Sequence, residues 1–224
     1  MTNTLYIGPK NYSSWSLRPW LVLRWAGLEF AEHFIPLDQP GYGTGEIVEV
    51  KQVSPSGTVP ALHVNDLVIW DSLAIAEWAA EQVPSLWPQD PAVRAQARSV
   101  TAEMHSGFGG IRRDQAMNIK RRCPGQEWPE DTARDLSRMA DLWNECRARH
   151  GSRGPWLFGE RCIADAFFTP VATRFRTYSV PLDEVCQRYV ETLLGDADFL
   201  AWEAECVTDV WDKPGFPVID GLYV

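Results

Sequence analysis

Two short residue pairs, Val59-Pro60 and Asp71-Ser72, have the types and spacing needed to hold a small peptide. Pro60 stands directly before the strand-like residues 61–64, where a proline cannot donate a hydrogen bond to a sheet. An X-Pro bond at such a position is a candidate cis peptide. The cis form would turn the backbone N–H and C=O of the preceding residue out of the sheet. The pair therefore predicts a backbone clamp for a peptide.

Asp71-Ser72 follows a strand-like run over 67–70 and opens a helix rich in Ala, Glu and Leu over 73–82. Ser72 has two interpretations here. Its side chain can cap the helix, as serines at helix starts often do. Alternatively, the free N–H groups of the helix start bind a ligand carboxylate, while Asp71 binds a ligand ammonium. The second interpretation suits a small zwitterionic peptide.

The stretch S-P-S-G-T-V-P-A-L over 54–62, followed by D-S-L-A-I-A-E-W over 71–78, resembles the glutathione-binding half of the glutathione S-transferase family. The resemblance implies that Pro60 is the family's cis-proline and that Val59 makes the backbone contact to the cysteinyl part of glutathione. It also implies that Asp71 and Ser72 bind the γ-glutamyl part. Glutathione would then be a co-substrate, without a metal, and the chain would pair as a homodimer.

The hydroxyl groups ahead of the first helix are the candidates for ionising the glutathione thiol. A free thiol with a pKa of about 8.5 is only slightly ionised at neutral pH, and one charge-assisted hydrogen bond contributes roughly 1.5–3 kcal/mol toward lowering it. The sequence N-Y-S-S-W-S-L-R over 11–18 resembles the serine-type motif S-S-C-S-W-R of the zeta class. Its register implies that Ser13 is catalytic, with Ser14 as the second candidate. Helix capping is the structural alternative for both.

Trp15 stands where the zeta motif has a cysteine, which disfavours the zeta isomerase activity. Because no cysteine precedes Cys123, the cysteine-type branch of the family is excluded. Trp15 is also placed in the predicted second-substrate site.

The first helical segment after residue 91 offers a wall for a second substrate. His105, Phe108 and Arg112 recur at i, i+3 and i+7, on one face of a helix, beside three glycines. In the family the corresponding helix covers the cleft over the glutathione sulfur. An inward face would suit an aromatic or unsaturated electrophile with an anionic or carbonyl oxygen. An exposed, solvated face is the alternative.

The remaining pattern of the first part predicts a thioredoxin-like βαβαββα domain over 1–82. The expected elements are strands over 4–8 and 31–36, a helix that begins near residue 15, a short helix over 46–53, and the hairpin and helix described above. Pro19 limits where the first helix begins, because a helix interior tolerates proline poorly.

Three prolines within 83–91 indicate an interdomain linker, and residues 92–224 read as an all-helical domain. The expected helices lie over 92–118, with a weak point at the glycines 107, 109 and 110, and over 131–150, 163–177, 182–194 and 197–207. The whole resembles the architecture of cytosolic glutathione transferases.

Composition narrows the class of partner and the compartment. With 21 basic and 30 acidic residues the formal net charge is −9, which argues against nucleic acid or an anionic membrane as the main partner. Neither a signal peptide nor a membrane-spanning run is evident, so a cytoplasmic location is predicted. Five widely spaced cysteines, without a C-x-x-C pair, predict buried, reduced thiols rather than disulfides or zinc ligands.

These observations favour a glutathione transferase that conjugates glutathione to a small electrophile. Two alternatives remain open at this point. One is a catalytically weak glutathione-binding or scaffolding protein of the same fold, and the other is a glutathione-dependent isomerase or peroxidase. Retention of Asp71-Ser72 together with the hydroxyl-rich helix start favours an enzyme.

Overall fold

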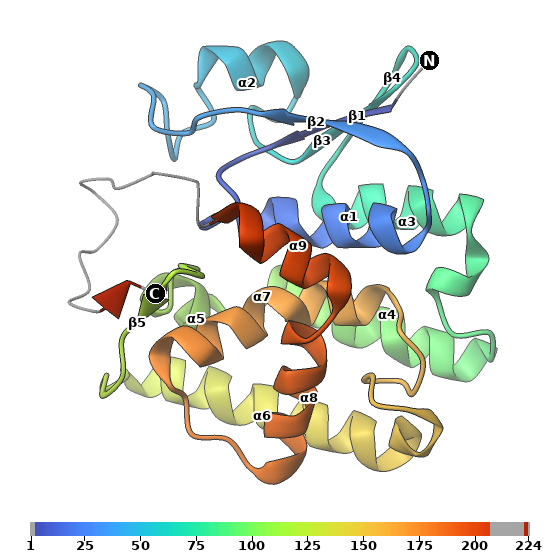
Figure 1. Cartoon of the computed structure of the whole chain (residues 1–224), viewed down its shortest axis with the longest axis vertical. Helices are drawn as coiled ribbons and strands as arrows, with labels where there is room; N and C mark the ends of the chain where they lie inside the picture. Colours follow the sequence, from blue (N-terminus) through green and yellow to red (C-terminus); the bar gives the residue numbers. More distant parts are fainter. Residues whose placement is uncertain (1–2, 207–221, 224) are drawn as a thin grey trace.

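A four-stranded mixed sheet forms one layer of the molecule (Figure 1). The computed structural model describes residues 3–206 and 222–223. The strands are β1 (Asn3–Ile7), β2 (Phe30–Phe34), β3 (Ala61–Val64) and β4 (Leu67–Trp70), in the order β2-β1-β3-β4. β1 pairs parallel with β2 and antiparallel with β3, and β3 and β4 form the predicted hairpin. The predicted thioredoxin-like order is confirmed.

Helices cover both faces of this sheet (Figure 1). α1 (Ser14–Trp25) and α3 (Ser72–Gln82) lie on one face, where Leu5 and Ile7 of β1 join the main hydrophobic core. α2 (Val48–Val53) lies on the other face, over a small cluster of Ile35, Ile47 and Val50. The start of α1 thereby follows the end of β1 after a short loop over residues 8–13, which is where the predicted site requires it.

The rest of the described chain is mainly helical and packs below α1 and α3 (Figure 1). Its helices are α4 (Pro91–Ser106), α5 (Gly109–Asp114), α6 (Glu130–His150), α7 (Ile163–Tyr178), α8 (Glu184–Leu194) and α9 (Ala197–Cys206), with short 3-10 turns at Pro84–Leu86 and Gly151–Arg153. α7 contacts α1, α4 and α8, and all of its residues except Arg176 are buried. A helix that is buried on all sides can carry a charge to the centre of the molecule, and α7 does so with Arg174.

The start of α7 is fixed by a capping interaction. The Asp165 carboxylate accepts hydrogen bonds from the backbone N–H groups of Leu157 and Cys162, at 3.0 and 2.8 Å, and from the Tyr189 hydroxyl at 2.8 Å. Cys162 takes the cap position where a serine or threonine is usual, and its sulfur completes the reciprocal box. This network fixes the depth at which α7 lies in the core.

Three sequence predictions need correction. The helix expected over 92–118 is broken: α4 ends at Ser106, and Phe108 takes a left-handed conformation with φ 58° before α5 begins. The second part is not purely helical, because β5 (Arg121–Arg122) pairs antiparallel with β6 (Leu222–Tyr223). α1 begins at Ser14, so that Pro19 lies beyond the first turn. Val207, the predicted last residue of the final helix, lies outside the described residues.

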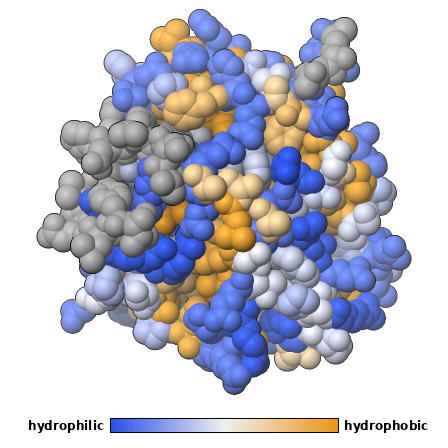
Figure 2. All heavy atoms as spheres, in the orientation of Figure 1, coloured by the Kyte–Doolittle hydropathy of each residue, from blue (hydrophilic) through white to orange (hydrophobic). Residues whose placement is uncertain are grey.

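Other predictions on this part are met or stay open. All five cysteines are buried and unpaired, as predicted, and burial raises the pKa of the Cys146 and Cys186 thiols to about 12. The domain division at residues 82 and 92 stays a prediction, although a short 3-10 turn and the start of α4 at Pro91 occupy the predicted linker. On the face drawn in Figure 2, apolar side chains form patches that hydrophilic residues interrupt.

Candidate functional site

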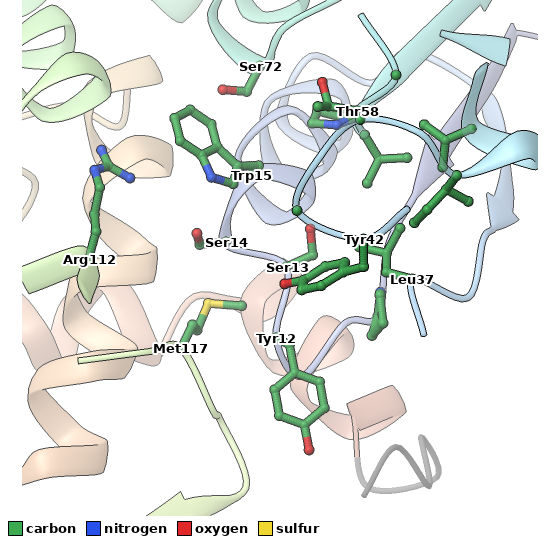
Figure 3. Close-up of a pocket in the computed structure, with 18 of the residues that line it drawn as sticks. Tyr12, Ser13, Ser14, Trp15, Leu37, Tyr42, Thr58, Ser72, Arg112 and Met117 are labelled. Carbon is green, nitrogen blue, oxygen red and sulfur yellow. The ribbon is translucent and has the colours of Figure 1, made fainter. Parts of the chain in front are cut away.

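A cavity of about 620 Å³ opens where the thioredoxin-like part meets α5 and α7 (Figure 3). The start of α1, the loop 41–45, the residues before β3 and the start of α3 line one side, and Arg112, Met117 and Arg174 line the other. Six hydroxyl-bearing side chains face it: Tyr12, Ser13, Ser14, Tyr42, Thr58 and Ser72. Among the described lining residues, the only carboxylate is that of Asp71. The cavity is therefore rich in hydroxyl donors and cations.

Ser13 is the N-cap residue of α1 and lies at the cavity wall with 9% of its surface exposed. Its Oγ accepts a hydrogen bond from the backbone N–H of Ser16 at 3.3 Å and lies 2.7 Å from the Ser16 Oγ. The Ser16 Oγ in turn accepts from the backbone N–H of Gly8 at 3.1 Å. The Ser16 hydroxyl can therefore donate to Ser13, which leaves the Ser13 proton free for a ligand.

Ser14 is the first residue of α1 and lines the same cavity. Its Oγ accepts a hydrogen bond from Nη2 of Arg174 at 3.2 Å. The guanidinium of Arg174 also donates to the backbone carbonyls of Gln115 and Pro170, at 2.7 and 2.8 Å. A hydroxyl that accepts from a cation is a better donor through its own proton, so Ser14 is a second candidate for thiolate contact.

The predicted peptide clamp has the expected backbone form. The Val59-Pro60 bond is cis, and both residues line the cavity beside Thr58. In Figure 3, Thr58, Tyr42 and Leu37 lie on the side of Ser13, whereas Ser14 lies toward Arg112 and Met117. The clamp and the two serines thus share one cavity. Whether Val59 and Pro60 bind a ligand stays a prediction.

Asp71, rather than Ser72, caps α3. One Asp71 carboxylate oxygen accepts from the backbone N–H groups of Leu73 and Ala74, at 2.8 and 3.3 Å, from a backbone with φ 74°. The capping alternative for Ser72 is therefore wrong. Its buried Oγ has no hydrogen-bond partner among the described residues, although it lines the cavity. An unpaired buried hydroxyl at a helix start is available to a bound anion.

The second Asp71 oxygen lies 3.3 Å from Nε2 of His105. Burial alone would raise the pKa of Asp71, but the hydrogen bonds from His105, Leu73 and Ala74 outweigh burial and lower it. Asp71 is thus held as a carboxylate. Besides this contact, the ring of His105 packs edge-to-face against the ring of Trp15, with the ring centres 5.3 Å apart. His105 is not among the residues that line the cavity.

The predicted wall for a second substrate is only partly assembled. Arg112 lines the cavity, and its guanidinium carbon lies 4.9 Å from the ring centre of Trp15, which is 37% exposed. Phe108 is buried in the main core and is not among the lining residues. The single helical face predicted from His105, Phe108 and Arg112 is wrong, because the chain breaks at Gly107 and Phe108.

Two arginines that sequence reasoning missed complete the cationic side of the site. Arg174 contacts Ser14, and burial, with nearby Arg112, lowers its pKa to about 10. Arg18 is fully buried, and its guanidinium lies 4.3 Å from the ring of Trp15 and 5.1 Å from that of Phe167. None of its three nitrogens has a hydrogen-bond partner in the described chain. The available signal for Arg174 was that the run over 163–178 is largely apolar and holds only three charged residues, Asp165, Arg174 and Arg176.

Two kinds of feature are absent from the described residues. Across residues 3–206 and 222–223, no group of three or more His, Cys, Asp or Glu side chains is arranged to hold a metal ion. No helix in the same ranges is both long and apolar enough to cross a membrane.

Comparison with known proteins identifies the family of the first domain. Residues 12–82 match the family described as glutathione S-transferase, N-terminal domain. A maleylacetoacetate isomerase of Rattus norvegicus is 34% identical over 106 residues, which are 46% of this chain and 48% of that protein. A maleylpyruvate isomerase of Ralstonia sp is 27% identical over 155 residues, 66% of this chain and 73% of that protein. The match to the rat protein spans about half of its length.

Solved structures extend the likeness of fold to almost the whole chain. A glutathione transferase homolog from Burkholderia GL BGR1, with bound glutathione, has a TM-score of 0.69 at 22% identity and covers 93% of this chain and 99% of that one. A theta class enzyme from Xanthomonas axonopodis pv. citri, also with glutathione bound, has a TM-score of 0.64 at 23% identity and covers 89% and 96%. Residues 12–82 are thus similar in sequence to the N-terminal domain of glutathione S-transferases, and nearly the whole chain shares the fold of solved glutathione transferases.

Proposed function

We propose that this chain binds glutathione in the cavity and ionises its thiol at the start of α1, as a transferase. One observation carries the proposal: Ser13 and Ser14 both use their oxygens as acceptors toward the protein, and so can donate toward the cavity. The N-terminal end of a helix adds a favourable potential for a thiolate at the same point. A scaffolding protein would require neither arrangement.

In this proposal the γ-glutamyl end of glutathione lies at the start of α3. The unpaired Ser72 Oγ and the backbone N–H groups there suit its carboxylate, and Asp71 suits its ammonium. The Val59 backbone, before the cis-Pro60, binds the cysteinyl part. This pose directs the thiol toward Ser13, since all of these groups line the one cavity.

Calorimetry with glutathione tests the binding site. The double variant Asp71→Asn with Ser72→Ala is expected to weaken binding by more than about tenfold, because both ligand charges lose a partner. Asparagine keeps an oxygen that can cap α3. The exposed turn residue Asp66 offers a matched control, and Asp66→Asn should bind as the wild type does. Wild-type affinity in the double variant would refute the assignment.

The role of Ser13 is tested by the thiolate absorbance of bound glutathione as a function of pH. Ser13→Ala should raise the pKa of the thiol by about one unit or more, the effect of one lost charge-assisted hydrogen bond, and Ser13→Thr should restore it. Ser14→Ala is expected to have the smaller effect. If only Ser14→Ala moves the titration, Ser14 faces the sulfur instead.

For the second substrate we propose a small unsaturated or aromatic electrophile that carries an anionic group. Arg112 and Arg174 line the cavity beside Trp15, with Arg18 behind it, and the one lining carboxylate, Asp71, is already engaged. Guanidinium groups bind carboxylates well and stabilise an enolate without giving up a proton. The named activities of the rat and Ralstonia relatives are isomerisations of maleyl compounds, which are of this class.

The same site supports glutathione-dependent isomerisation as a second candidate function. The thiolate adds to one carbon of a cis double bond, and the electron pair of the double bond moves onto the conjugated carbonyl as an enolate. Protonation of the enolate carbon yields the conjugate. In the unprotonated enolate, rotation can instead occur about the carbon–carbon bond that was double. The electron pair then returns to re-form the double bond and the thiolate is expelled, which yields the trans isomer and regenerates the glutathione thiolate.

Mass balance of glutathione separates the two functions. With maleylpyruvate as probe, a transferase consumes one glutathione for each substrate, whereas an isomerase leaves glutathione unchanged while the trans product accumulates. Arginines are poor proton donors because their pKa is far above neutrality, which favours expulsion over protonation for such substrates. Absence of both products, with glutathione still bound, would favour a binding protein without catalysis.

A further inference from the structure

The helix that carries Arg112 to the cavity is too short to hold itself in place. α5 has six residues, and its N-cap residue Phe108 makes no side-chain capping bond. Isolated helices of this length are unstable in water, because the first turn costs more conformational entropy than its hydrogen bonds return. The conformation of α5 must therefore be fixed by other parts of the chain.

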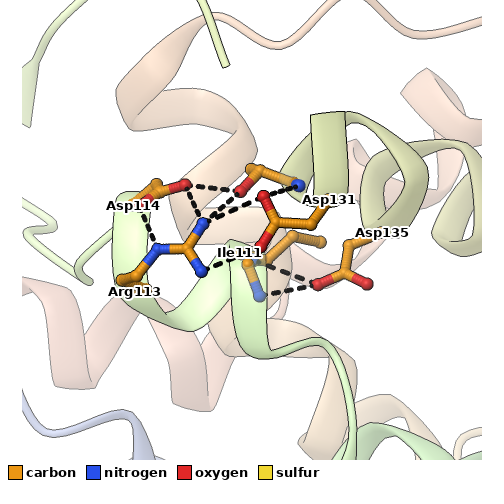
Figure 4. Close-up of polar contacts among 7 residues, drawn as sticks. Ile111, Arg113, Asp114, Asp131 and Asp135 are labelled. Atoms are coloured by element: carbon orange, nitrogen blue, oxygen red, sulfur yellow. Dashed lines mark hydrogen bonds and ion pairs between the residues drawn. The ribbon is translucent and has the colours of Figure 1, made fainter. Parts of the chain in front are cut away.

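Asp135 of α6 supplies the missing cap (Figure 4). One of its carboxylate oxygens accepts from the backbone N–H of Gly110 at 2.8 Å and from that of Ile111 at 3.3 Å. Gly110 permits this approach, since a Cβ there would lie 2.7 Å from the Cα of Thr132. The start of α5 is thereby docked against the first turns of α6.

Arg113 makes the second connection between the two helices (Figure 4). Its guanidinium donates to both carboxylate oxygens of Asp131, at 2.9 and 3.1 Å, and to both oxygens of Asp114 at 2.8 Å. These bidentate contacts fix the plane of the guanidinium as well as its position. We call Arg113, Asp131 and Asp135 the α5 clasp.

Arg112, the neighbour of Arg113, projects from α5 toward the cavity. Its Nε donates to the carbonyl of Gly107 at 2.9 Å, and its Nη2 donates to the carbonyls of Met104 and His105 at the end of α4. Its Nη1 has no hydrogen-bond partner among the described residues. Arg112 is thus held by two nitrogens on one side, with the third available to a ligand.

We propose that the α5 clasp positions Arg112 for an anionic second substrate, so that Arg113 and Asp135 set substrate selectivity without touching the substrate. The backbone of α5 is joined to α6 only a residue away from Arg112. Loss of the clasp would shift the guanidinium relative to Trp15 and the serines. The inference rests on the proposed function, because it assumes that Arg112 binds the substrate's anionic group.

The test is a double-mutant cycle with binding as its readout. Dissociation constants of dinitrobenzoate and of the neutral dinitrobenzene are measured by calorimetry on the full chain saturated with glutathione. The variants are Arg113→Gln, Arg112→Ala and the two combined. Arg138→Gln is the matched control, since Arg138 is a similarly exposed arginine of α6 in a bidentate pair with Glu103 and does not touch α5.

Arg113→Gln is expected to weaken dinitrobenzoate binding by about two- to tenfold, the lower part of the range of couplings between neighbouring residues, and to leave dinitrobenzene binding unchanged. In the Arg112→Ala background the same substitution should have no further effect. Arg138→Gln should match the wild type. A purely structural role for the clasp would instead weaken both ligands equally, and that outcome overturns the inference.

The remaining outcomes separate the two hypotheses. If Arg112→Ala binds dinitrobenzoate as tightly as the wild type, the anionic subsite of the proposed function is refuted. If Arg112→Ala weakens binding but Arg113→Gln behaves as Arg138→Gln does, only the clasp is refuted. Should Arg113→Gln fail to fold, Asp135→Asn replaces it, because it weakens the cap of α5 and leaves the Arg113 ion pairs in place. It is expected to show the same selective loss.

Discussion

Replacing Arg18 by methionine is expected to raise the pKa of the glutathione thiol without lowering the stability of the fold. Arg18 is fully buried on α1, and none of its guanidinium nitrogens has a partner in the described chain. Burial, together with the charges of Arg112 and Arg174, lowers its pKa well below the ordinary value, and Asp71 opposes this only weakly. A folded pKa below the unfolded one means that folding disfavours the charged form. The charge therefore destabilises the folded state at neutral pH.

The effect on the thiol follows from the position of Arg18 one helical turn after Ser14. Residues four apart on a helix have Cβ atoms about 5–6 Å apart, so a thiolate at Ser14 or Ser13 would lie about 8 Å from the guanidinium. With an effective dielectric constant of about 20, a unit charge at that distance stabilises a thiolate by about 2 kcal/mol, or about 1.5 pKa units. The opposing charge of Asp71 reduces this, and we expect a rise of about one unit.

The free energy of unfolding should stay unchanged or rise. Methionine loses the cation–π contacts of Arg18 with Trp15 and Phe167, each contributing up to about 2 kcal/mol in a desolvated setting. It also removes an uncompensated buried charge, whose effective cost in proteins is several kcal/mol. The two contributions are of similar size, so the free energy of unfolding should be equal to or higher than that of the wild type.

Thiolate absorbance against pH and urea unfolding measure the two quantities on the same variants. Arg18→Lys is the control, because it keeps the charge and should keep most of the lowering of the thiol pKa. An unchanged thiol pKa in Arg18→Met would refute the electrostatic role of Arg18. A large loss of stability in Arg18→Met would instead show that the guanidinium is a structural requirement of the core.

Three further predictions concern the scaffold. Asp165→Asn should cost about 2–4 kcal/mol in urea unfolding, because an amide nitrogen would face buried N–H donors, whereas Tyr189→Phe, which removes one donor, should cost about 1 kcal/mol. The lowered pKa of Asp71 stabilises the fold above about pH 4. This contribution to the free energy of unfolding should be lost as the pH falls through the folded pKa of Asp71. In Asp71→Asn, the free energy of unfolding should therefore depend less on pH in this acid range. Light scattering should give twice the 25.3 kDa mass of the chain if it pairs as a homodimer, and the monomer mass would contradict that prediction.

The sequence was sufficient wherever a structural decision is local. The turn before Pro60, the hairpin and the helix start at Asp71 are each specified within a few residues, so the cis bond and the strand order could be predicted. The register of S-S-W-S placed Ser13 and Ser14 at the start of α1 for the same reason. Asp71, and not Ser72, is the N-cap residue of α3. Its positive φ places its carboxylate within hydrogen-bonding distance of the N–H groups of residues 73 and 74.

Prediction failed where several distant segments decide the outcome. The sequence over 105–112 has a helical period, yet the helix is interrupted there. Phe108 is buried in the main hydrophobic core, and Asp135 caps a new helix that begins at Gly109. Periodicity cannot report a cap that comes from 25 residues away. The short ladder between β5 and β6 is another such case, because it joins segments about a hundred residues apart.

The cationic side of the cavity shows the same limit of prediction from sequence. Arg18, Arg112 and Arg174 come from α1, α5 and α7, and only Arg112 was predicted for the site from its own stretch of sequence. Only the packing of α7 against α1 brings them to one side of the cavity. Trp15 makes this accumulation tolerable, because its ring lies within 5 Å of both the Arg18 and Arg112 guanidinium carbons. In the proposed function, the tryptophan at the position of the zeta-class cysteine therefore supports the binding of an anion beside the thiolate.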